Sequence, residues 1–251
     1  MEYKFELIRM LVMAVLAFLL AMGLTPIMTN ILYRFQIWKK PQKISSLDKK
    51  KTPVYLKLHA DKHKRNIPFM AGIVVWISVA LLTLLFNLSR EQTYLPLFAL
   101  LAMGIVGLVD DWLDWRGIGA GKGLSAKMKM FWIIFIAVVG AWWFYYKLGW
   151  SGIHVPLYGD FDIGWWYMPL FIFIIISSAN AVNITDGLDG LAAGLLALCF
   201  AAFAGIAFFQ GNIGIAIFCA CMVGALLAFL WFNIPPARFM MGDTGSLAFG
   251  A

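Results

Sequence analysis

Charged side chains are scarce in this sequence. Asp, Glu, Lys and Arg make up only 13% of its 251 residues, whereas hydrophobic residues make up 62%. Soluble domains carry roughly a quarter charged residues and about 45–50% apolar ones. This composition excludes an ordinary soluble domain and predicts an integral membrane protein.

Cysteine and histidine are also rare, with three of each. All three cysteines lie in apolar segments, where packing is a better explanation than a disulfide framework or a metal site. They are Cys199, Cys219 and Cys221. His59 and His63 have helical spacing, but Ala60 stands where a zinc protease carries Glu. The third histidine, His154, falls in a loop.

Long apolar runs occupy most of the chain. A membrane-spanning helix needs about 20 apolar residues, and seven segments qualify: 7–33, 69–88, 95–109, 128–147, 168–183, 191–209 and 214–232. The final GSLAFGA begins like an eighth. We therefore expect an all-α, polytopic bundle in a single membrane domain over residues 1–251, which stops inside a helix as a C-terminally incomplete copy of a longer protein. A cleaved signal peptide at 1–24 is the alternative, but no small-residue cleavage site follows.

Basic residues predict how the bundle is oriented. Sixteen of the 20 Lys and Arg residues fall in the loops 34–68, 110–129 and 233–246, and four fall on the other side of the predicted spans. Cytoplasmic loops carry the excess of Lys and Arg, so the N-terminus is predicted to lie outside and the three loops in the cytoplasm. The net charge of +7 follows from this asymmetry and does not indicate nucleic-acid binding.

Acidic residues collect on the same predicted face. Asp110 and Asp111 end the third apolar segment, Asp186 and Asp189 follow the fifth, and Asp243 precedes the eighth. Each group alone could be a solvated helix end or a helix cap, but three groups on one face favour a shared site. If helical, the adjacent Asp110 and Asp111 project about 100° apart and need different partners.

Carboxylates, amides and lysines at a membrane face suit phosphate chemistry. Mg²⁺ binds one or two carboxylates together with waters and substrate phosphates. Phosphoryl transfer needs such a metal, cationic side chains and an in-line nucleophile. A transporter or channel is the non-enzyme alternative, but it would place ionisable residues near mid-membrane, in broken helices, whereas these acids lie at helix ends.

Four motifs, HKRNIPFMAG, GLVDD, NAVNITDGLDGL and FNIPPARFMMGDTGS, resemble those of the polyprenyl-phosphate N-acetylhexosamine-1-phosphate transferases. This resemblance implies ten helices, a cytoplasmic active site in the bacterial inner membrane, and Mg²⁺. It also implies the peptidoglycan reaction in which undecaprenyl phosphate attacks UDP-N-acetylmuramoyl-pentapeptide, giving lipid I and UMP. A chain without its last helices is then expected to have little activity of its own, and a homodimer is left open.

The resemblance also assigns roles to single residues. It implies that Asp243 is the principal Mg²⁺ ligand with Asn183 beside it, and that Asp110 and Asp111 form the essential pair, Asp110 deprotonating or positioning the lipid phosphate. Further residues are implied to bind substrate, the lysines through phosphates or the uridine end: Lys64, Lys122, Lys129, Asn183, Asp186, Gly187, Leu188, Asp189 and Asn233.

Some residues depart from the family pattern. NIPFMAG replaces a Gly-Thr-Pro-Thr-Met-Gly-Gly run, and its Ile67–Pro68 pair resembles relatives that transfer N-acetylglucosamine-1-phosphate, the alternative reaction for teichoic acid or O-antigen synthesis. Thr185 favours the muramoyl substrate. An aromatic residue that stacks on uracil often precedes Met-Gly-Asp, but here Met240 holds that place and Phe239 comes one residue earlier.

Overall fold

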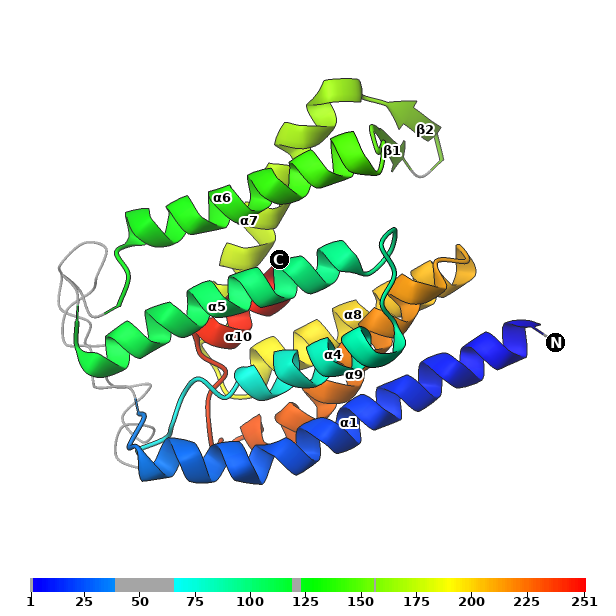
Figure 1. Cartoon of the computed structure of the whole chain (residues 1–251). Coiled ribbons are helices and arrows are strands. Elements are labelled where there is room, and N and C mark those ends of the chain that lie inside the picture. The colour runs from blue at the N-terminus through cyan, green and yellow to red at the C-terminus, as the bar shows by residue number, and fades with distance from the viewer. Residues whose placement is uncertain (1, 39–65, 119–122, 156) are drawn as a thin grey trace.

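The computed structural model describes residues 2–38, 66–118, 123–155 and 157–251. They form a helical bundle with one small hairpin (Figure 1). The helices are α1 (Glu2–Arg34), α4 (Ile73–Phe86), α5 (Tyr94–Arg116), α6 (Ala126–Trp142), α7 (Tyr167–Thr185), α8 (Leu191–Phe209), α9 (Ile213–Asn233) and α10 (Asp243–Gly250). A π-helical turn, Trp143–Lys147, extends α6, and a 3-10 turn, Gly164–Trp166, leads into α7.

The predicted all-α membrane bundle is confirmed. Within the part of the chain that the structure describes, six helices are long and apolar enough to cross a membrane. The predicted segment 69–88 forms the shorter α4, whose 14 residues extend about 21 Å. The predicted start of an eighth helix corresponds to α10.

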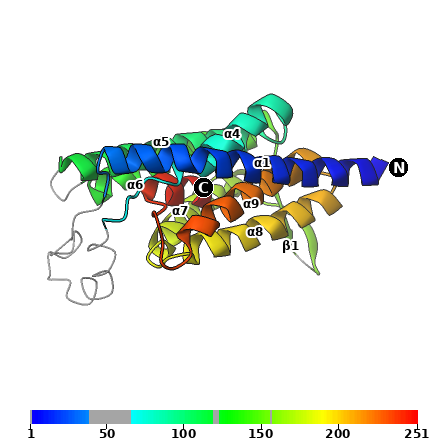
Figure 2. The same ribbon diagram turned by 90° about the horizontal axis from the view of Figure 1, so that it is seen from below.

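Both ends of the bundle can be followed in two views. The N-terminus and the antiparallel hairpin of β1 (Gly152–Val155) and β2 (Gly159–Asp162) lie at one end (Figures 1 and 2). The C-terminal end of α5, the N-terminal end of α6 and the α9–α10 connection lie toward the opposite end. All the acids singled out in the sequence belong to elements that meet there.

Helix α5 is longer than the sequence predicted. Asp110 and Asp111 were expected to end it, but it continues to Arg116 and ends at Gly117, which has φ 71°. A left-handed residue at this position is a common helix terminator, and glycine adopts it without strain. The acidic pair therefore lies inside a regular helix, more than a turn before its end.

Helix α9 is the most buried of the six long apolar helices and forms the centre of the larger apolar core. Helices α1, α8 and α4 pack against it. Small residues line the α1–α9 contact, including Ala17, Ala21 and Ala225, all fully buried. Small residues let helix backbones approach closely in a membrane. The approach is tightest where a Cβ on Gly224 would overlap the Ala14 carbonyl oxygen.

A second, smaller core joins α5, α6, α7 and α10. It contains Met103, Val106, Ile133, Ala179 and Leu247 among its buried members. Helix α10 packs against α5, α7 and α4, so that a helix of eight residues contacts three longer ones. The first residue of α10, Asp243, is thereby held next to α5.

The α1–α9 contact predicts a stability difference between two glycine positions. Gly224→Val should destabilise the protein by about 1–3 kcal/mol, because the added side chain overpacks a contact with main chain. Gly205→Val in α8 is the matched control, since nothing lies within 4 Å of its Cβ position. Thermal unfolding of both variants in one detergent checks this, and equal melting temperatures would contradict it.

Candidate active site

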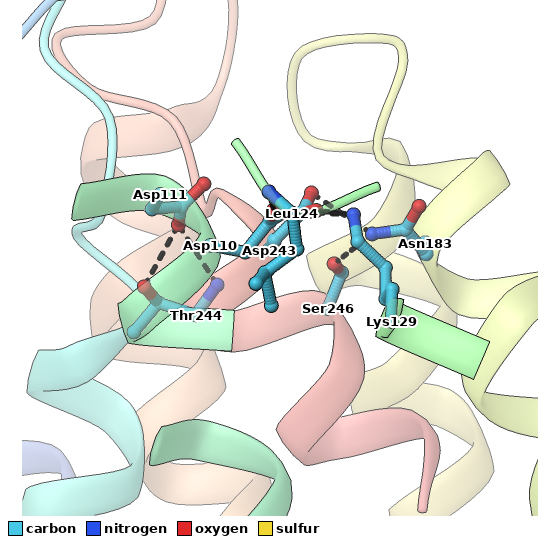
Figure 3. Close-up of polar contacts among 8 residues, drawn as sticks. All are labelled: Asp110, Asp111, Leu124, Lys129, Asn183, Asp243, Thr244 and Ser246. Carbon is cyan, nitrogen blue, oxygen red and sulfur yellow. Dashed lines mark hydrogen bonds and ion pairs between the residues drawn. The ribbon is translucent and has the colours of Figure 1, made fainter. Parts of the chain in front are cut away.

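Asp110 and Asp243 converge on one lysine. The Lys129 ammonium lies 2.6 Å from Asp110 Oδ2 and forms a second ion pair with Asp243 Oδ2. Figure 3 shows the three side chains pointing toward one another from α5, α6 and α10. The second oxygen of each carboxylate also accepts a hydrogen bond, Asp110 Oδ1 from the Leu124 N–H at 2.5 Å and Asp243 Oδ1 from Asn183 Nδ2 at 2.9 Å.

Asp111 faces a different partner, as the helical spacing predicted. Its Oδ2 accepts hydrogen bonds from the Thr244 N–H at 2.9 Å and from the Thr244 hydroxyl at 2.7 Å. The first N–H groups of a helix lack partners within that helix, and negative charge is favourable at this end. Asp111, only 2% exposed, therefore holds the N-terminus of α10 from within α5.

Glycines allow this approach of α10 to its neighbours. A Cβ on Gly107 would overlap the Asp243 carbonyl oxygen, and one on Gly72 would lie 2.5 Å from the Gly245 Cα. Gly242, with φ 75°, leaves Asp111 Oδ2 only 2.5 Å from its own Cβ position. A side chain at Gly107 or Gly72 would require a shift of the main chain, and one at Gly242 would also be strained by the positive φ.

The NIPFMAG segment, residues 66–72, contacts the residues that lead into α10. The Ala71 and Gly72 N–H groups donate to the carbonyl oxygens of Met240 and Met241 at 3.1 and 3.0 Å, and the Met240 N–H donates to the Pro68 carbonyl oxygen at 2.8 Å. These main-chain hydrogen bonds hold residues 240–241, which lead into α10, against residues 68–72. Two segments more than 160 residues apart in the sequence form this support together.

Asn183 bridges α7 and α10. Its Nδ2 donates to Asp243 Oδ1 and to Ser246 Oγ, both at 2.9 Å, and its amide oxygen points away from Asp243 (Figure 3). The structure therefore brings Asn183, Asp110, Asp243 and Lys129 into one cluster. Asp111 lies next to this cluster through Thr244.

The NITDGLDGL loop lies beside the cluster, between α7 and α8. Asp186 follows the last residue of α7, and the turn up to Gly190 is not helical, so Asp186 and Asp189 do not share a helix face. Asp189 Oδ2 accepts a hydrogen bond from the Ala237 N–H at 3.3 Å. Leu188 is exposed and Gly187 is partly exposed.

Asn233 connects the two loops that border the site. Its Oδ1 accepts from the Gly190 N–H at 3.0 Å and its Nδ2 donates to the Phe239 carbonyl oxygen at 2.9 Å. The side chain is buried, with 4% exposed, so both ends of its amide are used to hold main chain. In this structure its role is to position the loops, while its predicted contact with substrate stays a prediction.

Phe239 is not available to stack on a base. It is buried, and its ring lies 5.2 Å from that of Phe229 and 5.7 Å from that of Phe232. Two of the predicted lysines, Lys64 and Lys122, lie outside the described residues, as do His59 and His63. Lys129 is the one predicted phosphate-binding lysine that the described residues include, and it lies at the centre of the cluster.

Thr244 and Ser246 are the polar side chains that the sequence reasoning missed. Both are fully buried and hydrogen bonded to predicted site residues, Thr244 to Asp111 and Ser246 to Asn183. They belong to the MGDTGS motif, from which the sequence analysis selected only Asp243. The available signal was that Asp243, Thr244 and Ser246 lie within about one helical turn.

One cavity of the described residues is separate from these acids. It has a volume of about 490 Å³ and lies between α5, α6, α7, α8, α9 and the end of α10. Its walls are almost wholly apolar, with Phe171, Phe200 and Met222 among them, and no Asp, Glu, Lys or Arg lines it. The polar cluster and the apolar cavity are thus two distinct features of the bundle.

The Asp111–Thr244 contact can be tested without removing a charge. Thr244→Val keeps the side-chain shape but removes the hydroxyl donor, and a hydrogen bond to a charged group contributes about 1.5–3 kcal/mol. Thr29→Val in α1 is the control, because its hydroxyl donates only to the main-chain oxygen of Thr25. We expect Thr244→Val to have a lower melting temperature than Thr29→Val. Equal melting temperatures would show that the Asp111–Thr244 contact does not stabilise the fold.

More than half of the chain matches a known protein family. Residues 93–251 match the family described as glycosyl transferase family 4. A protein of Geobacillus sp. (strain WCH70), named phospho-N-acetylmuramoyl-pentapeptide-transferase, is 41% identical over 193 residues, which cover 74% of this chain and 59% of the relative. The Bacillus subtilis (strain 168) protein of that name is 40% identical with the same coverage.

One relative aligns over almost the whole chain. The Oceanobacillus iheyensis protein, also named phospho-N-acetylmuramoyl-pentapeptide-transferase, is 36% identical over 256 residues, covering 98% of this chain and 73% of the relative. Several of the other relatives are matched over about three fifths of their length. The family match and these identities confirm the resemblance found in the motifs, and the chain belongs to glycosyl transferase family 4.

Proposed function

We propose that the protein transfers phospho-N-acetylmuramoyl-pentapeptide from its UDP donor to undecaprenyl phosphate, as a phosphoglycosyl transferase of peptidoglycan synthesis. The observation that carries the proposal is the convergence of Asp110 and Asp243 on Lys129 toward one end of a membrane bundle. The name shared by the relatives supports the muramoyl donor. A membrane-embedded acceptor and a soluble nucleotide donor can meet only at such a boundary.

The proposed reaction exchanges one phosphoanhydride for another. A phosphate oxygen of undecaprenyl phosphate attacks the β-phosphorus of the donor, and the bond between that phosphorus and the oxygen bridging to the α-phosphate breaks. UMP leaves with the bridging oxygen, and lipid I carries the new diphosphate. In such reactions the protein contributes positioning and charge stabilisation more than covalent chemistry.

Two residues of the cluster supply these contributions. The Lys129 ammonium is a cation placed where negative charge of the diphosphate must be neutralised. Asp110, 7% exposed and paired with Lys129, is the carboxylate that we assign to deprotonate or orient the acceptor phosphate. Asp111 acts through Thr244 by holding α10 in place.

The donor set fits Mg²⁺, which the proposal includes. Asp243 would hold it with Asn183 nearby, since Mg²⁺ takes one or two carboxylates and fills its other positions with water and phosphate oxygens. No group of three or more His, Cys, Asp or Glu that could hold a metal is found among the described residues, and Mg²⁺ does not need one. When bound, Mg²⁺ would supply positive charge to the phosphates.

The proposal places the site at the cytoplasmic face of the bacterial inner membrane, with the N-terminus outside. Its support is the excess of Lys and Arg in the three loops 34–68, 110–129 and 233–246, on the side of the predicted spans that also carries the acidic residues. The described part of that end includes Arg34, Arg116 and Arg238. The loop of Asp186, Gly187, Leu188 and Asp189 borders the cluster and is the part of the site that we assign to the nucleotide.

The reaction can be tested on the full-length protein in detergent with undecaprenyl phosphate and Mg²⁺. We expect UMP release from UDP-N-acetylmuramoyl-pentapeptide and none from UDP-N-acetylglucosamine, measured by chromatography of the nucleotides. Release from UDP-N-acetylglucosamine alone would move the assignment to the N-acetylglucosamine-1-phosphate transferases. Release from neither donor would overturn the proposed activity.

The role of Asp243 gives a second test of the same reaction. Asp243→Asn keeps the side-chain size but removes a charge that pairs with Lys129 and would bind the metal, so turnover should fall by at least about 100-fold. Asp160→Asn, in the hairpin at the opposite end of the bundle, is the control and should leave turnover unchanged. Near-normal turnover of Asp243→Asn at saturating Mg²⁺ would exclude Asp243 as a metal ligand.

A further inference from the structure

The Lys129 ammonium lies where a cation bound by both carboxylates would lie. We propose that Lys129 is an internal counter-ion that competes with the divalent metal for Asp243 and Asp110, and that its ammonium leaves Asp243 when the metal binds. This inference rests on the proposed use of Mg²⁺ at this site. The inference adds that the free protein binds the metal weakly, because the Lys129 ammonium already pairs with the carboxylate oxygens that the metal would bind.

The arrangement of the four carboxylate oxygens supports the competition. In each of the two carboxylates, Oδ1 accepts a hydrogen bond from a fixed donor, the Leu124 N–H or Asn183 Nδ2, while Oδ2 faces Lys129. A cation that bound both carboxylates would meet them at the Oδ2 atoms. Those are the two atoms that the ammonium contacts.

The charges lead to the same conclusion. The Lys129, Asp110 and Asp243 side chains are only 22%, 9% and 19% exposed, so water screens them poorly. An ammonium and a divalent cation on the same two oxygens would repel each other strongly. Asp111 has a different partner, because its Oδ2 accepts hydrogen bonds from the Thr244 N–H and hydroxyl.

Lysine is suited to such a displacement. Its ammonium sits on a flexible four-carbon chain, and Lys129 lies in the first turns of α6, next to partly exposed surface. A lysine that stayed on the carboxylates would not become more accessible when the metal binds in the absence of substrate. A lysine that the metal displaces would, and the two cases can therefore be separated without an activity assay.

The first experiment measures Mn²⁺ binding by electron paramagnetic resonance, with the protein in phosphatidylcholine nanodiscs and no substrate. Lys129→Met should bind Mn²⁺ at least about tenfold more tightly than the wild type, because the competing charge is gone. Lys129→Arg should stay close to the wild type. Lys127→Met, two residues away and exposed, is the matched control and should not change the affinity.

The second experiment uses the unmodified protein, so it does not depend on how a variant folds. Lysines are acetylated briefly with acetic anhydride, with and without Mg²⁺, and the modification of each is quantified by mass spectrometry. Mg²⁺ should raise the modification of Lys129 and leave that of Lys127 unchanged.

The outcomes separate this inference from the proposed function. If Mn²⁺ binds the wild type and is lost in Asp243→Asn, but Lys129→Met binds no more tightly and Mg²⁺ does not expose Lys129, the competition is overturned and the metal site stands. If Asp243→Asn binds Mn²⁺ as tightly as the wild type, the metal assignment fails and the competition fails with it.

Discussion

The close contact between the N-terminus of α10 and α5 is the constraint on which the candidate site depends. Gly107 leaves room for the Asp243 main chain, and Asp111 binds the Thr244 N–H and hydroxyl. A carboxylate at the N-terminus of a helix is favourable both for hydrogen bonding and for the helix dipole. Because this contact fixes where α10 begins, it also fixes where Asp243 meets Asp110 and Lys129.

Most of the fold could be predicted from the sequence because long apolar segments are the strongest signal of membrane-spanning helices. Every predicted segment corresponds to a helix of the structure. The error at α5 has a local cause: the run of Asp110 and Asp111 looks like a helix end, but Trp112, Leu113 and Trp115 continue the helix to Gly117. The 100° spacing of adjacent helical residues correctly predicted different partners for the acidic pair.

The centre of the site was harder to predict because it depends on three segments distant in the sequence. Lys129 was one of three lysines that the family resemblance implied, and hydrophobic pattern alone does not distinguish it from Lys127, which is exposed. The difference arises from tertiary structure, since the partners of Lys129 come from α5 and α10. Asp186 and Asp189 could be placed near the site by topology alone, but their lack of a shared helix face depends on the turn that the loop adopts.

The charge balance of the cluster explains why one end of a membrane bundle can hold so many acids close together. Asp110, Asp111 and Asp243 are countered by Lys129 and by helix-end N–H groups, and unpaired carboxylates in such partly buried positions would be costly. Three carboxylates and one ammonium still leave a net negative charge, which one divalent cation can offset. A site that is stable without metal through its own lysine, yet remains short of positive charge, is suited to binding a metal together with the phosphates of a substrate.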